Sequence, residues 1–127
     1  MTVERFGSGG PYEEIYGYSR VVRIGPVLLT AGCTSTVDGT VAHAGDAAGQ
    51  AREAFGIALS ALAKAGATVD DVVRTRMYVT PAADADTIGR VHGEIFGSVR
   101  PAATLVIVAG LIHPDLLVEV EVEAYLP

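Results

Sequence analysis

Three glutamates near the C-terminal end, Glu119, Glu121 and Glu123, alternate with valines, and carboxylates are well suited to proton transfer. Alternate side chains of a strand share one face, which places successive carboxylates about 7 Å apart. Like charges at that spacing raise the pKa of one of them when they are buried together. Two interpretations of Glu119 stay open: an acid that positions a water molecule, or one member of a solvated or interface-facing row.

Cys33 is the only cysteine and follows Gly32 on a predicted loop. A nucleophilic thiol needs a neighbouring base, and no sequence spacing brings His43, His92 or His113 to it. We therefore expect a partly buried, unreactive cysteine. The histidines form neither an HxH nor an HExxH pattern, so we expect no metal site.

Three tyrosines near the N-terminus, Tyr12, Tyr16 and Tyr18, form another group with two open interpretations. They could line a ligand pocket, or they could lie at an interface between copies of the chain. For Tyr18 both roles are compatible.

Composition limits the classes of function. The chain has 127 residues, of which 50% are hydrophobic, and its formal net charge is −6. This fits one domain, residues 1–127, that binds neither nucleic acid, which needs clustered Lys and Arg, nor a membrane, since no apolar run approaches about 18 residues. One cysteine excludes an internal disulfide, and the first residues lack a signal-peptide pattern, so we expect a cytoplasmic protein.

The elements that position these residues follow from turns and periodicity. Gly25-Pro26 separates two strand-like runs, residues 20–24 and 27–31, which indicates a β-hairpin. A helix is predicted from an Asp46 cap to Gly66. Its apolar stripe consists mostly of alanines, which predicts close packing of the helix on a sheet.

The second half predicts a strand over 73–79, a helix from about Asp84 to Gly97, and strands over 104–109 and 117–125. The strand 104–109 is apolar on both faces, which is typical of a central strand. The order β-β-α-β-α-β-β predicts an α+β fold, a mixed sheet with two helices on one face. The other face would carry polar and apolar side chains without cover, which favours homo-oligomerisation.

Nine short stretches follow one another in a characteristic order: Pro11-Tyr12, Gly17-Tyr18-Ser19, Thr30-Ala31-Gly32, Gln50, Ala65-Gly66-Ala67, Asp71-Val72-Val73-Arg74-Thr75, Phe96, Arg100-Pro101-Ala102 and Leu117-Val118-Glu119-Val120-Glu121. Together they resemble the Rid superfamily, the YjgF-type reactive-intermediate deaminases also labelled L-PSP. The resemblance implies a chorismate-mutase-like fold and a homotrimeric barrel with small-molecule clefts between subunits. It also implies hydrolysis, without a cofactor, of an enamine or imine of a 2-keto acid to the keto acid and ammonia.

The resemblance assigns the catalytic role to Glu119 and substrate binding to Tyr18 and the backbone near Gly32. Two further cleft positions depart from the family pattern. Ala31 lies where serine is common, and Cys33 lies where glutamine or threonine is common.

The largest departure is Ala103. In active members an arginine follows the Pro-Ala step and binds the substrate carboxylate. A charge-assisted hydrogen bond contributes about 1.5–3 kcal/mol, so its loss would weaken binding roughly ten- to a hundredfold. Arg76, Arg100 or Arg20 could replace it, or Arg74 and Arg76 could pair with acids across the trimer interface.

Two functions therefore stay open. The first is hydrolytic deamination of a small imine or enamine, which the presence of Glu119 and Tyr18 favours. The second is a non-catalytic trimer that binds a metabolite or an enzyme partner, which Ala103 favours. Ribonuclease activity, sometimes ascribed to the family, fits poorly with a net charge of −6.

Overall fold

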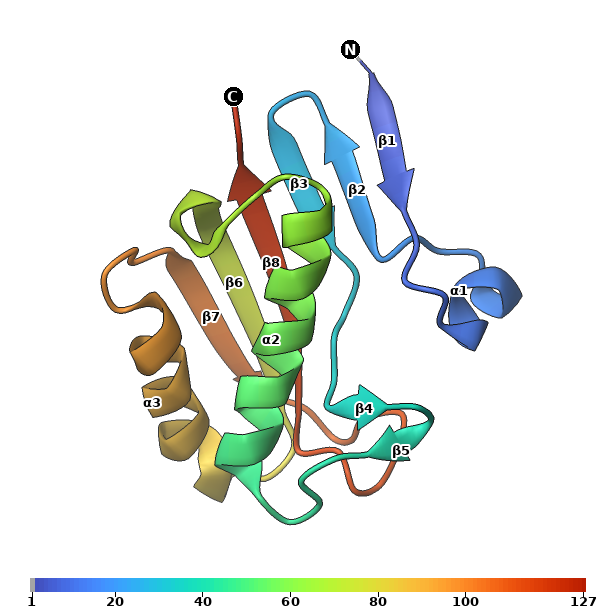
Figure 1. Cartoon of the computed structure of the whole chain (residues 1–127). Helices are drawn as coiled ribbons and strands as arrows, with labels where there is room; N and C mark the ends of the chain where they lie inside the picture. Colours follow the sequence, from blue (N-terminus) through green and yellow to red (C-terminus); the bar gives the residue numbers. More distant parts are fainter. Residues whose placement is uncertain (1) are drawn as a thin grey trace.

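The computed structural model describes residues 2–127, and a six-stranded mixed sheet forms its centre (Figure 1). The strand order is β1-β2-β3-β8-β6-β7, in which only the β6–β7 pair is parallel. The strands are β1 (Val3–Phe6), β2 (Val21–Ile24), β3 (Val27–Thr30), β6 (Val72–Val79), β7 (Ala102–Ile107) and β8 (Val118–Tyr125). A separate small hairpin consists of β4 (Thr36–Val37) and β5 (Thr40–Val41).

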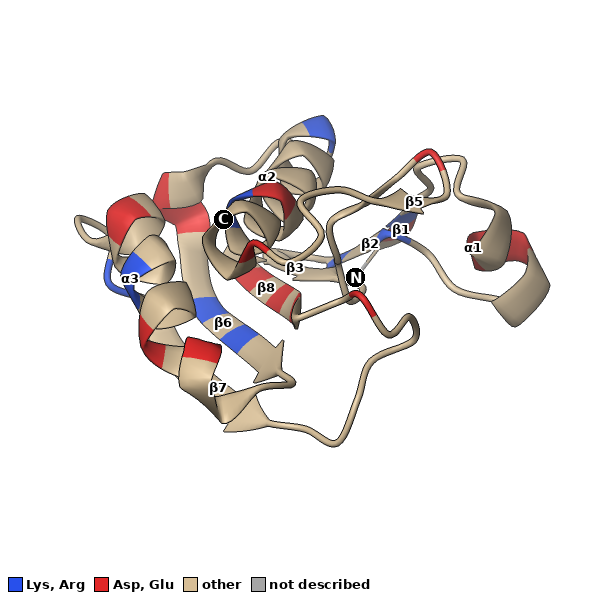
Figure 2. Ribbon diagram, turned by 90° about the horizontal axis from the view of Figure 1, so that it is seen from below, with Lys and Arg blue, Asp and Glu red and all other residues tan. Residues whose placement is uncertain are grey.

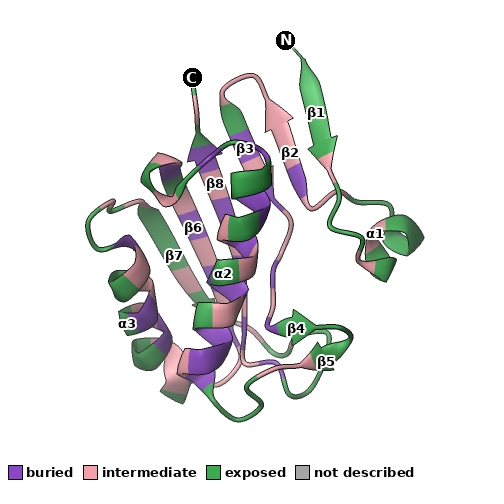
Figure 3. Cartoon of the chain, in the orientation of Figure 1, coloured by how far each residue is buried: buried purple, intermediate pink, exposed green. Residues whose placement is uncertain are grey.

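Two helices, α2 (Ala47–Lys64) and α3 (Ala85–Phe96), cover one face of the sheet, as the sequence predicted (Figure 1). The core lies between them and the central strands (Figure 3). A short helix, α1 (Pro11–Tyr16), lies beyond β1 and β2, and 3₁₀ turns occupy Val69–Asp71 and Ala82–Asp84. Among the helices of residues 2–127, none is long and apolar enough to cross a bilayer.

Helix α2 begins and ends where its sequence signals predicted. The Asp46 carboxylate accepts a hydrogen bond from Gly49 N–H at 3.0 Å, which satisfies a backbone donor of the first turn. Gly66 follows the helix with a φ of 99°, a conformation that glycine adopts without steric cost. Ala51, Ala54 and Ala58 are fully buried, so the small side chains do allow the helix to lie close to the sheet.

Strand β8 is the centre of the sheet, and its alternation of valine and glutamate sets the orientation of the two faces. Val118, Val120 and Val122 are fully buried under the helices, while the intervening glutamates lie on the opposite face. That opposite face has no helical cover within residues 2–127 (Figure 1).

The prediction for strand β7 was wrong in one respect: it is an edge strand and not a central one. The crossover through α3 brings β7 parallel to β6, and β8 then inserts between β3 and β6. The apolar side chains Val106 and Ile107 are 42% and 48% exposed. Strand β1 and helix α1 were not predicted from the sequence, and neither element contains a buried residue.

A buried polar contact joins the sheet to α3. The Thr75 hydroxyl, which is fully buried, lies 2.7 Å from Nε2 of His92, and His92 also packs against Phe55 and Phe96. Burial lowers the pKa of His92.

We predict that the free energy of unfolding falls as the pH falls below about 6.5, because the unfolded chain binds a proton at His92 that the folded chain resists. Urea unfolding between roughly pH 7.5 and 5.5 measures this slope. In His92→Gln the slope should be shallower. An unchanged slope in that variant would contradict the assignment.

Candidate functional site

The candidate site lies where the pairing between β3 and β8 shifts register. Leu29 lies opposite Glu123, whereas Cys33 lies opposite Val120, so the first strand carries one residue more over this stretch. The Thr30 hydroxyl accepts a hydrogen bond from Val122 N–H at 3.0 Å and bridges the interruption. Such bulges redirect side chains and are common beside active sites.

Glu119 places its carboxylate over this bulge. A Cβ at Gly32 would overlap the Glu119 carboxylate, so the close approach requires glycine at this position. Burial raises the pKa of Glu119, repulsion from Glu121 raises it further, and the positive charge of Arg20 opposes both effects. The result is a carboxyl group whose pKa is moved toward neutrality, as a general base requires.

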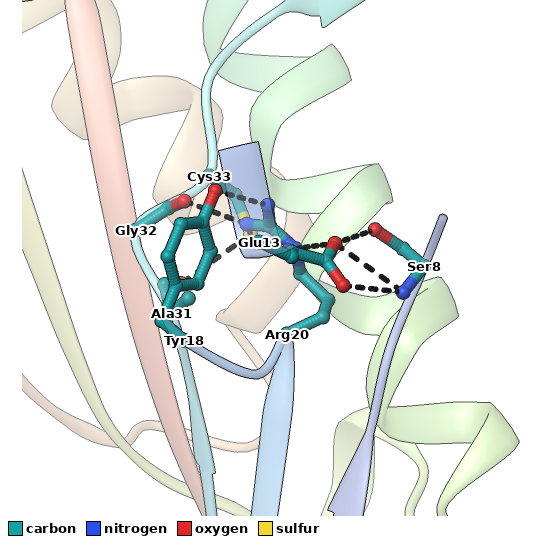
Figure 4. Close-up of polar contacts among 7 residues, drawn as sticks. All are labelled: Ser8, Glu13, Tyr18, Arg20, Ala31, Gly32 and Cys33. Carbon is teal, nitrogen blue, oxygen red and sulfur yellow. Dashed lines mark hydrogen bonds and ion pairs between the residues drawn. The ribbon is translucent and has the colours of Figure 1, made fainter. Parts of the chain in front are cut away.

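Arg20 holds the residues of the bulge together (Figure 4). Its Nη1 donates to the Gly32 carbonyl at 2.7 Å and lies 3.5 Å from the Cys33 sulfur. Its Nη2 donates to the Tyr18 hydroxyl at 3.4 Å, and its Nε lies 3.7 Å from the Glu13 carboxylate. The Arg20 side chain thus fixes both the Gly32 backbone, over which the Glu119 carboxylate lies, and the Tyr18 hydroxyl.

Tyr18 borders an open groove on the uncovered side of this cluster. The groove has a volume of about 630 Å³, and its lining includes Tyr18, Leu29, Thr30 and Ala31. The Tyr18 side chain is 39% exposed, and the Arg20 guanidinium carbon lies 5.5 Å from the centre of its ring. Cation–π contact at this distance restrains the ring without burying its hydroxyl.

Cys33 is 1% exposed, more deeply buried than the sequence analysis expected. Its thiol donates to the Ala31 carbonyl at 3.4 Å. Burial raises the pKa of Cys33, and only the nearby Arg20 opposes that rise. A buried thiol with a raised pKa holds little thiolate, which agrees with the expectation of an unreactive cysteine.

The uncovered face continues from Glu119 as a row of paired charges between β6 and β8 (Figure 2). The Tyr78 hydroxyl donates a short hydrogen bond to Glu121, and Arg76 lies 3.3 Å from the Glu123 carboxylate. Arg76 therefore pairs with an acid of its own chain. In the strand pairing Arg76 lies opposite Glu121, two residues along β8 from Glu119, and its contact partner Glu123 lies two residues further on.

Two residues predicted for the site, Ala103 and Arg100, lie in β7 or just before it and do not belong to the cluster around Arg20. Ala103 is opposite Thr75, whose side chain contacts α3, so Ala103 belongs to the helix-covered face. Glu119 lies on the other face, because it pairs with Tyr78. Arg100 is exposed before β7 and has a φ of 58°, which is uncommon for a residue other than glycine.

From the sequence, Arg20 was predicted only as a replacement cation, and Glu13 was not predicted at the site. Arg20 comes one residue before β2, and β3, which pairs with β2 in the hairpin, leads into Gly32. This placement is the sequence feature that could have identified Arg20. The Ala31 N–H donates to the Arg20 carbonyl at 2.8 Å, so hairpin pairing brings the two segments together. Within residues 2–127 no group of three metal-binding side chains comes together.

The chain is similar in sequence and in structure to several known proteins. Residues 11–126 match a family model described as endoribonuclease L-PSP. The crystal structure of Rv2704 from Mycobacterium tuberculosis, a member of the YjgF/YER057c/UK114 family, is 44% identical with a TM-score of 0.89, covering 98% of this chain and 100% of that one. The uncharacterised protein SCO2049 of Streptomyces coelicolor is 42% identical over 97% of this chain and 92% of its own. The 3-aminoacrylate deaminase RutC of Acinetobacter baylyi is 38% identical over 63% of each chain.

We predict that Arg20→Gln exposes Cys33 to thiol reagents. Loss of the charge-assisted bond to Gly32 removes about 1.5–3 kcal/mol from the local free energy of opening, so native-state labelling should accelerate roughly ten- to a hundredfold. The rate is measured with a chromogenic disulfide in the absence of denaturant.

Arg23→Gln is the matched control, because Arg23 also donates to backbone carbonyls, at Gly25 and Leu126, but away from Cys33. It should lower global stability and leave the native-state labelling rate near that of the unmodified chain. Equal acceleration in both variants would mean that labelling follows global unfolding and that Arg20 does not hold this bulge specifically.

Proposed function

The chain belongs to the endoribonuclease L-PSP family, also called the YjgF/Rid family, and from this premise we propose that it hydrolyses a small reactive imine or enamine. The observation that carries the proposal is the Glu119 carboxylate held over Gly32 with its pKa raised by burial. The partial match to a protein named 3-aminoacrylate deaminase supports the reaction class, because 3-aminoacrylate is an enamine.

In the proposed reaction Glu119 acts as the general base. It removes a proton from water as the water oxygen bonds to the C=N carbon, and the C=N electron pair moves to nitrogen, which takes up a proton. Glu119 then passes the hydroxyl proton of the resulting carbinolamine to its amino group, the C–N bond breaks, ammonia leaves, and a carbonyl forms. An enamine substrate first takes a proton at carbon to give the imine. A carboxylate with a raised pKa can return the proton it has taken.

Tyr18 and the Gly32 backbone are the proposed substrate contacts. The Tyr18 hydroxyl borders the groove, and Arg20 restrains it. Among residues 2–127 no acceptor binds the Gly32 N–H, which leaves a donor beside the Glu119 carboxylate. Backbone donors fixed in place in this way stabilise charge that develops on a reacting group. The backbone next to Cys33 and the side chain of Ala31 complete the proposed wall of the site.

The substrate class differs from that of family members with an arginine after the Pro-Ala step. Ala103 and Ala31 offer no polar side-chain atoms, and Arg76 is engaged by Glu123. We therefore propose a substrate that is small and not held by a carboxylate clamp at position 103. Arg100 is the free exposed cation of the β7 segment and the proposed replacement, since no ion pair engages it among residues 2–127.

We also propose that three copies assemble into a barrel with the clefts at their seams, as the Rid resemblance implies. The uncovered sheet face and the exposed apolar side chains of β7 support assembly, since apolar surface of this kind is unusual on a monomer. Multi-angle light scattering should give about three times the 13.1 kDa of one chain. A stable particle of one chain's mass would contradict the assembly.

The family model's description names an endoribonuclease, but the charge of this chain favours a small metabolite over RNA. The net charge is −6, and Arg20, Arg52, Arg76 and Arg90 each lie within 4.0 Å of an acid. Counterion release, which provides most of the affinity for a polyanion, needs unpaired and clustered cations.

The catalytic prediction is tested with 2-aminoacrylate, generated in place by a pyridoxal-phosphate lyase. The protein should speed the decay of this enamine and of its imine, and Glu119→Gln should reduce that acceleration by about a hundredfold or more. Glu123→Gln is the control, since Glu123 lies on the same face but pairs with Arg76 and should matter little.

The alternative, a trimer that binds a metabolite without turning it over, has its own expected result. If the unmodified chain gives no acceleration and Ala103→Arg restores it, the site is a redirected or disabled deaminase site. Acceleration that is equal in Glu119→Gln and in the unmodified chain would exclude Glu119 as the base.

The pH dependence gives a second prediction. Activity should fall as the pH drops through the raised pKa of Glu119, because the protonated acid cannot accept a proton. Glu121→Gln removes a repulsive charge, so the acidic limb of the profile should move to lower pH. A limb that stays in place, or moves to higher pH, would contradict the assignment of that limb to Glu119.

A further inference from the structure

A second pocket lies on the other side of Arg20, between the flank of α2 and the N-terminal strands. Its volume is about 340 Å³, within the usual size range of small-ligand pockets. It arises because α2 lies over the centre of the sheet and leaves β1 and β2 uncovered (Figure 1). No residue of the proposed deaminase site except Arg20 lines it.

The pocket has an apolar floor and a polar rim. Phe6, Ile57 and Ala61 provide apolar surface, whereas Ser8 and Ser60 provide hydroxyl groups. This combination, apolar walls with a few polar groups, is typical of sites that hold a small organic molecule in one orientation.

Gly56 lines this pocket from α2. It lies within α2, where glycine is less favourable than alanine, and a Cβ at this position would meet no atom within 4 Å. Neither close packing nor a positive φ requires glycine here. What the glycine does is leave the helix bare where it forms the pocket wall.

The rim of the pocket holds one cation without an acidic partner. Lys64, the only lysine of the chain, lines the pocket, and no acid lies within ion-pair distance of it among residues 2–127. The acid of the same rim, Glu53, lies 3.7 Å from Nε2 of His43, a contact that is an ion pair only when His43 is protonated. Arg20 lies 3.7 Å from Glu13, so the rim cation without an acidic partner is Lys64, and burying an apolar body beside it favours a ligand with one negative end.

We propose that this pocket binds a small carboxylic acid with an apolar body, whose carboxylate pairs with Lys64 while its chain covers Phe6 and Ile57. The site is separate from the one over Gly32. Arg20 belongs to both, since it lines this pocket and also holds the Gly32 carbonyl.

The test uses hexanoate as the probe and the sole lysine as the reporter. Reductive ¹³C-methylation keeps the charge of Lys64 and gives one side-chain signal besides that of the α-amino group. Titration with hexanoate should shift this signal and the Ile57 methyl signals to saturation. Hexanamide lacks the negative charge, so its dissociation constant should be higher than that of hexanoate by about tenfold or more.

Gly56→Leu fills the pocket and should abolish the saturable shift, while its helix remains favourable because leucine is a better helix former than glycine. Gly93→Leu is the matched control: it is a glycine of α3 that also has no atom within 4 Å of an added Cβ. It should leave hexanoate binding unchanged, and circular dichroism should find both variants folded.

Three outcomes would overturn the proposal: no saturation with hexanoate, equal binding of hexanamide, or equal loss in Gly56→Leu and Gly93→Leu. Glu119→Gln separates this proposal from the proposed deaminase activity. It should leave the hexanoate titration of Lys64 unchanged, so failure of one proposal does not imply failure of the other.

Discussion

The hydrogen bond from Arg20 to the Gly32 carbonyl is the contact on which the rest of the site depends. The register shift between β3 and β8 leaves backbone groups that no neighbouring strand can satisfy. A guanidinium can satisfy one of them and still reach its neighbours, because its donors point in several fixed directions. It does so here toward Tyr18 and Cys33, and Glu13 balances its charge.

The elements that could be predicted from sequence are those whose burial is periodic. Helix α2 repeats its alanines at helical spacing, and β8 alternates valine with glutamate, so each pattern reports one buried face. Strand β1 and helix α1 have no such pattern, because they lie at the margin of the sheet and bury little. Strand β7 shows the limit of the method. Its two apolar faces predicted a central, buried strand, but the apolar pattern does not contain the strand order, and β7 lies at the edge with most of its residues exposed.

The residues of the candidate site also differ in how far the sequence predicts their positions. Hairpin pairing and the central place of β8 bring Glu119 against Gly32, and Arg20 links Gly32 to Tyr18, while the roles assigned to these residues stay a prediction. The role of Arg20 in making this link was not predictable from spacing. It depends on a one-residue bulge, and a bulge has no simple sequence signature apart from the glycine it contains. The raised pKa of Glu119 likewise depends mainly on three-dimensional burial, which the alternation of charges does not contain.

The position of Ala103 constrains how any cleft of this protein can be built. Strand pairing fixes its side chain on the helix-covered face, two strands away from β8, whereas Glu119 lies on the uncovered face. A residue cannot change face without shifting the whole register of its strand by one, which would expose the buried row of β6 and β7 partners. One chain therefore cannot bring positions 103 and 119 to the same ligand. A site built around Glu119 within one chain is thus formed by the uncovered face of β6 and β8 and by the bulge at Gly32, and the side chain at position 103 does not contribute to it.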